Sequence, residues 1–127
     1  MATVLTPRTD RAEIFCPVEL TLDVIGGKWK GAILFHLLDG RIRFNELRRL
    51  LPRVTQRMLT LQLRELEADG LVHREVYAEV PPRVEYSLTD FGRTLEPMVI
   101  AMKDWGNRYR RDLTGREEPS DTWCPVE

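Results

Sequence analysis

The chain has 127 residues, of which 43% are hydrophobic, so it is long enough for one modest core and too short for two ordinary domains. Its 19 lysines and arginines against 20 aspartates and glutamates give a net charge of −1, so the bulk composition by itself argues against a polyanionic partner. No apolar run approaches the ~20 residues that cross a bilayer, and the first ten residues lack a signal-peptide pattern, so we expect a cytoplasmic protein with no membrane partner.

The N-terminal part is predicted to hold two helices after a flexible arm at residues 1–13, which are polar and mixed in charge. Pro17 suits a first helical position and Gly26-Gly27 suits a helix end, so a short helix is expected from Pro17 to Ile25. Apolar residues at helical spacing predict a second, more buried helix from Lys28 to Asp39.

A short strand and a third helix are expected next. Charged and apolar residues alternate from Arg41 to Phe44, a pattern typical of a strand. Asn45 is a good N-cap for a helix from Glu46 to Leu51, which has to stop before Pro52.

The following segment, from Thr55 to Gly70, predicts an amphipathic helix with Thr55 as its N-cap and Gly70 at its end. Leucines form one stripe along it, at positions Leu59, Leu63 and Leu66. A polar face lies on another side and consists of Gln56, Arg57, Thr60, Arg64 and Glu67. Arginine fits guanine or phosphate and glutamine pairs with adenine, so this face suits a DNA groove, although a solvated helix face has the same composition.

Charge is unevenly distributed around these two helices. From residue 41 to residue 64 there are seven arginines, no lysine and one acid, Glu46, which gives this segment a net charge of +6. The arginines are Arg41, Arg43, Arg48, Arg49, Arg53, Arg57 and Arg64. Their planar guanidinium groups favour contacts to phosphates or bases, and the alternative is a solvated basic surface.

Beyond Gly70 the sequence predicts a β-hairpin. LVHREVY and VEYSL are rich in β-branched and aromatic residues, and AEVPPR separates them. Helix, helix, turn, helix and hairpin is the order of a winged helix-turn-helix, a mainly α fold with a small β-hairpin. Arg83 at the hairpin tip is either a minor-groove or phosphate contact or an exposed loop charge.

Thr89 caps a long final helix, expected from Asp90 to about Leu113 with a kink at Pro97. Its apolar positions are Leu95, Met98, Val99, Met102, Trp105 and Tyr109. We interpret this stripe as a dimer interface, because a two-fold dimer matches two DNA half-sites; the alternative is that it covers the core of one subunit. Residues 114–127 are predicted to be an acidic flexible tail after a domain at residues 14–113.

Four stretches between residues 16 and 109 carry a family resemblance: CPVELTLDVIGGKWK, RFNELRRLLPRVTQRMLTLQLRELEADGLVHREVY, PPRVEYSLTDFG and KDWG. Together they resemble the HxlR-type family of bacterial transcription regulators, relatives of the MarR winged-helix dimers. The resemblance implies a homodimer that docks one recognition helix per subunit into successive major grooves and that dimerises through the N-terminal segment and the long C-terminal helix.

Residue roles follow from the same resemblance. Base reading is assigned to Gln56, Arg57, Thr60 and Arg64. Contacts to the DNA backbone are assigned to Arg41, Arg43, Arg48, Arg49, Arg53 and the wing residue Arg83.

The two cysteines are candidates for redox sensing. Cys16 directly precedes a predicted helix, whose N-terminus stabilises a thiolate, and in several members of the resembled family the matching cysteine senses oxidants or electrophiles. The alternative is a partly buried, structural Cys16 that serves as N-cap. Cys124 lies in the predicted tail, and an intersubunit bridge between Cys16 and Cys124 is a second hypothesis.

No enzymatic, metal or cofactor site is indicated. His36 and His73 have no metal-ligand spacing to other residues, and the sequence has no phosphate loop or nucleophile elbow. The sequence therefore predicts a homodimeric, sequence-specific regulator on double-stranded operator DNA, expected to be a repressor with an unidentified effector. The alternative is a winged-helix module that binds proteins and not DNA.

Overall fold

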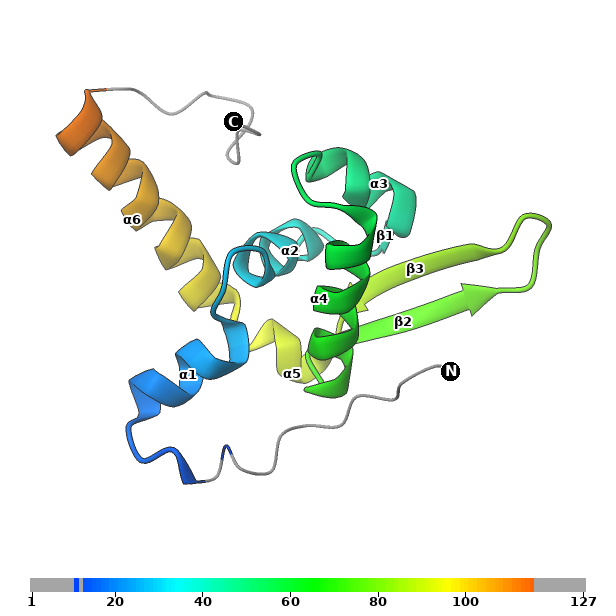
Figure 1. Cartoon of the computed structure of the whole chain (residues 1–127), viewed down its shortest axis with the longest axis horizontal. Coiled ribbons are helices and arrows are strands. Elements are labelled where there is room, and N and C mark those ends of the chain that lie inside the picture. Colours follow the sequence, from blue (N-terminus) through cyan, green and yellow to red (C-terminus); the bar gives the residue numbers. More distant parts are fainter. Residues whose placement is uncertain (1–10, 12, 116–127) are drawn as a thin grey trace.

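The computed structural model describes residue 11 and residues 13–115, which form six helices and three strands (Figure 1). Their order is α1 (Pro17–Ile25), α2 (Lys30–Leu37), β1 (Ile42–Arg43), α3 (Phe44–Leu50), α4 (Gln56–Ala68), β2 (Val72–Tyr77), β3 (Arg83–Leu88), α5 (Asp90–Arg93) and α6 (Glu96–Thr114). Helices α3 and α4 form a helix-turn-helix, and β2 and β3 form the wing beside it. The predicted winged helix-turn-helix fold is confirmed.

The core lies between α2, α3, α4 and the sheet. Its largest fully buried side chains come from these three helices and are Ile33, Leu34, Leu37, Leu47, Leu59, Leu63 and Leu66. The last three are the leucine stripe that the sequence predicts. Burying such a side chain stabilises the fold by about 1.5–3 kcal/mol, so the stripe fixes which face of α4 turns outward.

Helix α2 is shorter at both ends than predicted, and its first residue is a buried lysine. The Nζ atom of Lys30 lies 2.7 Å from Oε1 of Glu65 on α4. A buried ammonium needs such a partner, so this ion pair ties α2 to the middle of α4.

The sheet has three antiparallel strands in the order β1-β3-β2, so the central strand is β3. Arg43 of β1 and Glu75 of β2 are the two cross-strand neighbours of Glu85. The predicted strand between residues 41 and 44 is confirmed, and it joins the start of α3 to the wing.

Asn45 does not cap α3, which corrects the prediction. The helix begins at Phe44, and Arg43 with its extended backbone occupies the N-cap position. Pairing of Arg43 in the sheet places the helix start directly after β1, and the ring of Phe44 packs against that of Tyr86 with centroids 6.3 Å apart. The predicted cap of α4 is confirmed, since Oγ1 of Thr55 accepts a hydrogen bond of 3.0 Å from the backbone N–H of Met58.

The long final helix is interrupted and not merely kinked. Oγ1 of Thr89 accepts a hydrogen bond of 2.9 Å from the N–H of Gly92 and caps α5, which ends at Arg93. Helix α6 begins anew at Glu96, with Pro97 in its first turn. Proline has no N–H to bond back to residue 93 and its ring crowds that carbonyl, so the chain breaks the helix there and places Pro97 where it is tolerated.

Arg11 lies within residues 1–13, which are predicted to be a loose arm, but its own side chain is held by three contacts. Its Nε lies 2.7 Å from Oδ2 of Asp23 on α1, its Nη2 donates to the carbonyl of Asp23 at 3.1 Å, and its Nη1 lies 2.6 Å from Oδ1 of Asp69. Asp69 is the C-cap of α4. Burial lowers the pKa of Arg11, but the hydrogen bonds to Asp23 and Asp69 outweigh it and raise that pKa. Arg11 therefore joins α1 to the C-terminal end of α4.

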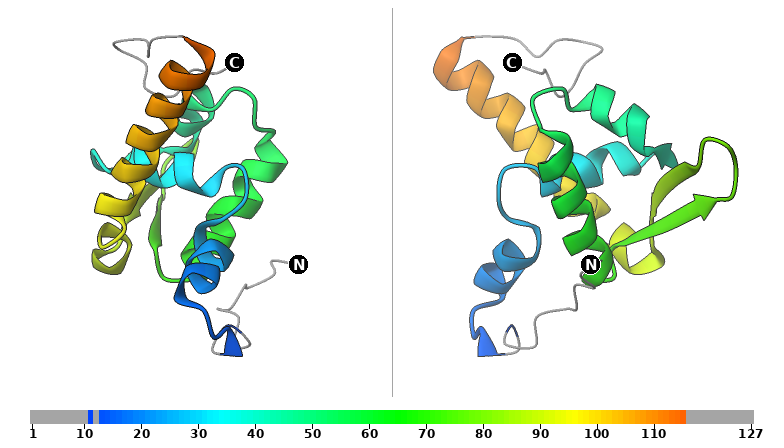
Figure 2. Two further views of the ribbon diagram at one scale, coloured as in Figure 1. Left: turned by 90° about the vertical axis from the view of Figure 1, so that its left-hand side faces the viewer. Right: turned by 45° about the vertical axis from the view of Figure 1, so that its right-hand side comes forward.

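Helix α6 and the wing extend from opposite sides of the domain (Figure 2). Helix α1 lies on the same side as α6, whereas α3 and α4 lie toward the wing (Figure 1). Among the described residues, no helix is long and apolar enough to span a membrane.

Candidate nucleic-acid interface

The outward face of α4 carries the polar residues that the sequence singles out. Gln56, Arg57, Arg64 and Glu67 are exposed, and Thr60 is half-buried. The leucine stripe on the opposite side is buried, so these side chains are held toward solvent by the packing of the core. The polar face predicted from the sequence is therefore the solvent-facing side of α4, and the buried leucines fix the orientation of this helix.

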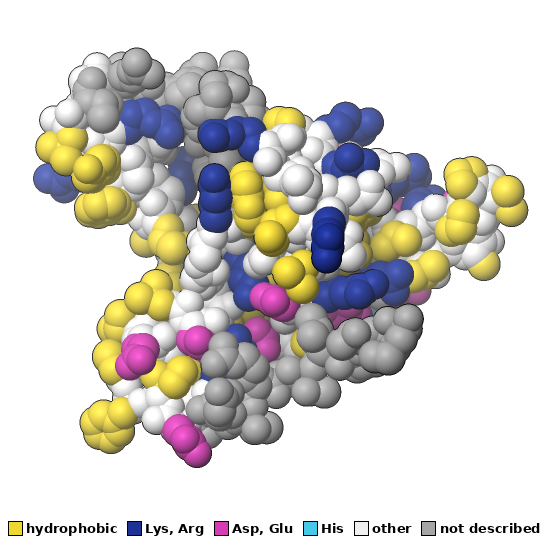
Figure 3. All heavy atoms as spheres, viewed as in Figure 1, with side chains coloured by type: hydrophobic (Ala, Val, Ile, Leu, Met, Phe, Trp, Pro, Cys, Tyr) yellow, Lys and Arg dark blue, Asp and Glu magenta, His cyan; other side chains and the backbone are white. Residues whose placement is uncertain are grey.

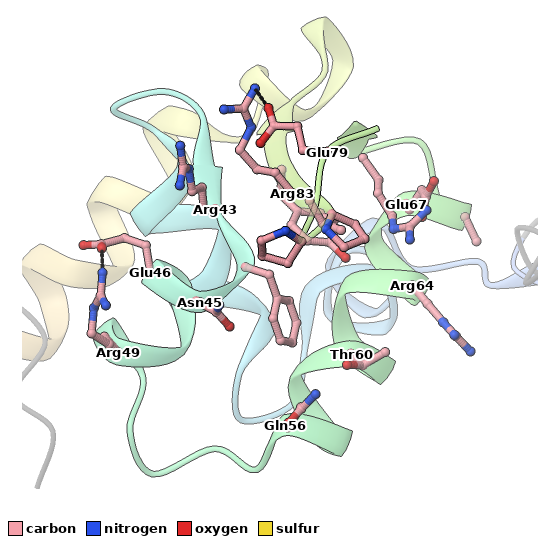
Figure 4. A pocket seen from close by; sticks show the side chains of 17 residues that line it. Arg43, Asn45, Glu46, Arg49, Gln56, Thr60, Arg64, Glu67, Glu79 and Arg83 are labelled. Carbon is pink, nitrogen blue, oxygen red and sulfur yellow. Dashed lines mark hydrogen bonds and ion pairs between the residues drawn. The ribbon is translucent and has the colours of Figure 1, made fainter. Parts of the chain in front are cut away.

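A groove of about 1240 Å³ runs between α3, α4 and the tip of the wing. Gln56, Thr60 and Arg64 extend from α4 along one side of it (Figure 4). The other sides are lined by Arg43, Asn45, Glu46 and Arg49 near α3 and by Glu79 and Arg83 of the wing (Figure 4). The groove thus combines hydrogen-bonding side chains of α4 with cationic groups from two other elements.

The predicted DNA-contacting arginines fall into two groups. The first group is exposed and makes no ion pair with any residue that the structure describes; it consists of Arg48, Arg53, Arg57 and Arg64. Lysine and arginine side chains gather over α3 and α4 in the space-filling view (Figure 3). An anion that approaches these arginines has to displace no carboxylate of the part of the chain that the structure describes.

In the second group every arginine is paired with a glutamate. Arg49 pairs with Glu46 on the same helix (Figure 4). Nη1 of Arg41 and Nε of Arg43 lie 3.6 and 3.7 Å from the carboxylate of Glu85. The hydroxyl of Tyr77 accepts a hydrogen bond of 2.6 Å from Arg41.

Arg83 also belongs to the second group, and of its two predicted alternatives the exposed loop charge does not agree with its place in β3. It is the first residue of β3, and its guanidinium lies 3.2 Å from both Glu79 and Glu85. Its Cζ lies 4.1 Å from the ring centroid of Tyr77, a cation–π contact. Arg83 is therefore built into the wing and does not extend freely from it.

Arg74 also lines the groove and is not among the residues predicted to contact DNA. It lies on β2 directly opposite Tyr86 of β3. Burial raises the pKa of the Tyr86 hydroxyl, and the hydrogen bond with Arg74 partly offsets this. Strand alternation in the sequence could have indicated this position, because Arg74 and Val76 are two residues apart and therefore share one face of β2.

Apolar side chains are exposed on the opposite side of the domain. Those of α6 and its C-terminal end are Met102, Trp105, Tyr109 and Leu113, and those near α1 are Phe15, Val18 and Leu22. In Figure 3 hydrophobic side chains gather over both helices, on the side away from the wing. The residues near α1 and Leu113 were not singled out in the sequence.

Val99 is a correction to the predicted dimer interface. It is 3% exposed and belongs to the core of its own subunit, and Leu95 and Met98 are partly buried against the same core. The N-terminal turns of α6 pack on the domain, so the apolar stripe is buried at its start and exposed farther along the helix. Only Met102, Trp105 and Tyr109 of the predicted set remain largely exposed.

Comparison with known proteins identifies the family. The model of the HxlR-like helix-turn-helix family matches residues 24–114. The chain belongs to this family. The HTH-type transcriptional regulator YdeP of Bacillus subtilis (strain 168) is 72% identical over 95 residues, which cover 75% of this chain and 74% of YdeP.

Two solved structures are similar to this HxlR-like regulator in both sequence and fold. The redox regulator HypR in its oxidized form is 73% identical, with a TM-score of 0.70 over 73% of this chain and 96% of HypR. HypR in its reduced form is 68% identical, with a TM-score of 0.74 over 80% of this chain and 100% of HypR. The HxlR-like chain is thus a transcriptional regulator with the winged-helix fold.

Cys16 of the HxlR-like chain stands at the N-cap position of α1. It is exposed, and its side chain makes no capping hydrogen bond, although its carbonyl accepts one of 2.9 Å from Leu20 N–H. Cys16 thus occupies the predicted N-cap position, but in the single chain its side chain is neither partly buried nor the group that caps the helix. Cys124 lies outside the described residues. Within the described part of the chain, no three histidine, cysteine or acidic residues come together as metal ligands.

Proposed function

We propose that this HxlR-like regulator binds operator DNA sequence-specifically as a homodimer and represses transcription. The observation that carries the proposal is the outward face of α4, where hydrogen-bonding side chains stand beside arginines that pair with no carboxylate of the described residues. An α-helix fits the major groove of B-DNA, and Arg and Gln are the side chains that pair bidentately with guanine and adenine.

Contacts are divided between bases and phosphates. Gln56, Arg57, Thr60 and Arg64 are assigned to bases because they occupy the exposed face of α4. Arg48 and Arg53 are assigned to phosphates because they are exposed beside that face and need not leave an ion pair. Arg41, Arg43, Arg49 and Arg83 are also assigned to phosphates, which have to compete with the glutamate partners of these arginines.

The second copy of the chain is proposed to cover the apolar surface of α1 and α6. Phe15 and Trp105 are 98% and 65% exposed in a single chain and belong to the apolar patch over α1 and α6, and an exposed patch of this kind marks an interaction surface (Figure 3). A two-fold dimer through this side presents two α4 helices to half-sites about 34 Å apart. Residues 14–113 would then form one DNA-binding and dimerisation domain.

Replacing Arg57 by alanine tests base reading. The variant is expected to bind its operator about 1–3 kcal/mol more weakly, because a bidentate base contact is lost, and to bind a scrambled duplex almost as well as wild type. Fluorescence anisotropy at fixed salt with both duplexes measures this difference.

Arg53→Ala is the matched control for Arg57→Ala. It removes one exposed arginine assigned to a phosphate, so both duplexes are expected to bind less tightly by the same factor. Equal operator affinity of Arg57→Ala and wild type would contradict the assignment of α4. If no duplex is retained at any salt concentration and a protein partner binds independently of salt, the protein-interaction module is the better description.

We also propose that Cys16 senses oxidants or electrophiles, by analogy with HypR, which is named a redox regulator. The support in this chain is an exposed thiol at the start of α1, beside the proposed dimer surface. Diamide would take two electrons and two protons from a pair of thiols to form a disulfide.

Diamide is expected to change the operator affinity of wild type and to leave that of Cys16→Ser unchanged. The measurement is operator affinity before and after diamide, followed by dithiothreitol to reverse the change. Cys124→Ser shows whether Cys124 is the partner thiol, since this variant would then respond like Cys16→Ser. An equal response of wild type and Cys16→Ser would exclude Cys16 as the sensor.

A further inference from the structure

Glu85 is the acidic centre of a cluster of arginines between β1 and the wing. Its carboxylate lies 3.6 Å from Nη1 of Arg41, 3.7 Å from Nε of Arg43 and 3.2 Å from Nε of Arg83. The Glu85 side chain is 14% exposed, whereas those of Arg41 and Arg43 are 59% and 63% exposed. One mostly buried carboxylate thus anchors two exposed arginines, Arg41 and Arg43, together with the half-buried Arg83.

The position of Glu85 is fixed by the sheet. It lies on the central strand, where Arg43 and Glu75 are its direct partners on β1 and β2. Tyr77 adds two contacts to the same cluster, since its hydroxyl accepts from Arg41 and its ring stacks under Arg83. Arg43 and Arg83 also line the groove beside α4 (Figure 4). The cluster therefore sets where these cations stand relative to the recognition helix.

This arrangement has two consequences for binding a polyanion. A phosphate that approaches Arg41, Arg43 or Arg83 has to compete with a carboxylate that is already in place, which weakens contacts to DNA of any sequence. The carboxylate also restricts the side-chain freedom of these arginines, which lowers the entropic cost for a DNA backbone that arrives in the right register.

We propose that Glu85 is a specificity-determining residue of the DNA interface, which acts by positioning Arg41, Arg43 and Arg83 and by reducing their attraction for non-operator DNA. This inference rests on the proposed DNA-binding function. Glu85 would then help the protein to distinguish operator from non-operator DNA, although it contacts neither base nor phosphate and is negatively charged like DNA.

The test compares Glu85→Gln with Glu75→Gln in the full-length chain. Both changes remove one negative charge from the same cross-strand pair, but Glu75 pairs with His73 and with none of the three arginines. Affinities for the operator and for a scrambled duplex are measured by anisotropy over a series of salt concentrations.

Glu85→Gln is expected to bind the scrambled duplex about three- to tenfold more tightly at low salt and with a salt slope steeper by about one, because one more phosphate contact forms. Operator affinity is expected to rise less, since the positioning of the arginines is lost, so the ratio of operator to scrambled affinity falls. Glu75→Gln is expected to keep the wild-type ratio.

Equal ratios of operator to scrambled affinity for Glu85→Gln and Glu75→Gln would overturn the inference. Weaker binding of Glu85→Gln to both duplexes would also overturn it, because it would indicate a purely structural role in the wing. Thermal unfolding of each variant identifies a folding defect, and Glu85→Asp, which keeps the charge, then has to restore the ratio at least in part. If the wild-type protein binds no operator, the proposed function itself is contradicted. If the wild type binds and Glu85→Gln keeps the same ratio of operator to scrambled affinity, only this inference is contradicted.

Discussion

Replacing Arg11 by alanine is expected to lower the free energy of unfolding by about 3 kcal/mol, since removing one partner of a buried ion pair leaves an uncompensated charge. Arg11 is 13% exposed and Asp69 is 8% exposed in their side chains. The substitution removes the cation that Asp23 and Asp69 share, and it also removes a positive group from the C-terminal end of α4, where the helix dipole favours one. Urea denaturation followed by tryptophan fluorescence at one fixed protein concentration measures the effect.

Arg108→Ala is the matched control for Arg11→Ala. Arg108 pairs with Asp112 at 3.2 Å on α6, but its side chain is 72% exposed. Exposed pairs of this spacing contribute about 0.3–0.5 kcal/mol, so the control should unfold nearly like wild type. Equal losses in the two variants would mean that Arg11 does not join α1 to α4 in solution.

The elements of the fold are readable from the sequence where local patterns decide them. The bounds predicted for α1 agree with the structure because Pro17 and Gly26 are local start and stop signals. The leucine stripe of α4 is buried as predicted because helical periodicity and burial have the same cause. Thr55 and Thr89 cap helices as predicted, since a cap needs only residues three positions away.

What the sequence did not reveal depends on contacts between distant residues. Arg11 and Asp69 are separated by 58 positions, and no periodic pattern marks such a pair. Glu85 reads as one polar residue of a strand, and only the register of three strands brings it to Arg41 and Arg43. Counting arginines predicted a cationic surface but did not distinguish free from paired ones.

The apolar residues of α6 illustrate a second limit. Val99 and Trp105 belong to one stripe by spacing, yet Val99 is buried in its own subunit and Trp105 is exposed. Helical periodicity shows which residues share a face. It does not show at which residue that face changes from buried to exposed. The break before Pro97 starts α6 at Glu96 and thereby decides how much of the helix extends beyond the core.

The exposed end of this stripe is the part proposed to bind a second copy of the chain. Trp105→Ala is expected to weaken the proposed homodimer by about 2–4 kcal/mol, which raises its dissociation constant about 30- to 1000-fold. Trp105 is 65% exposed in the single subunit and its ring lies 5.4 Å from that of Tyr109, so the pair offers a second copy a large rigid apolar surface. Buried tryptophans are among the residues that contribute most to interfaces. Sedimentation velocity over a dilution series measures the monomer-dimer equilibrium.

Val80→Ala is the control for Trp105→Ala, because Val80 is fully exposed at the wing tip, on the opposite side of the domain from α6. It should leave dimerisation unchanged. The weakened dimer should also lose operator affinity as the protein is diluted, since a monomer binds one half-site and forgoes the second. A Trp105→Ala protein that sediments as wild type at every concentration would show that the second copy does not cover this end of α6, whereas a monomer that keeps full operator affinity would contradict the two half-site arrangement.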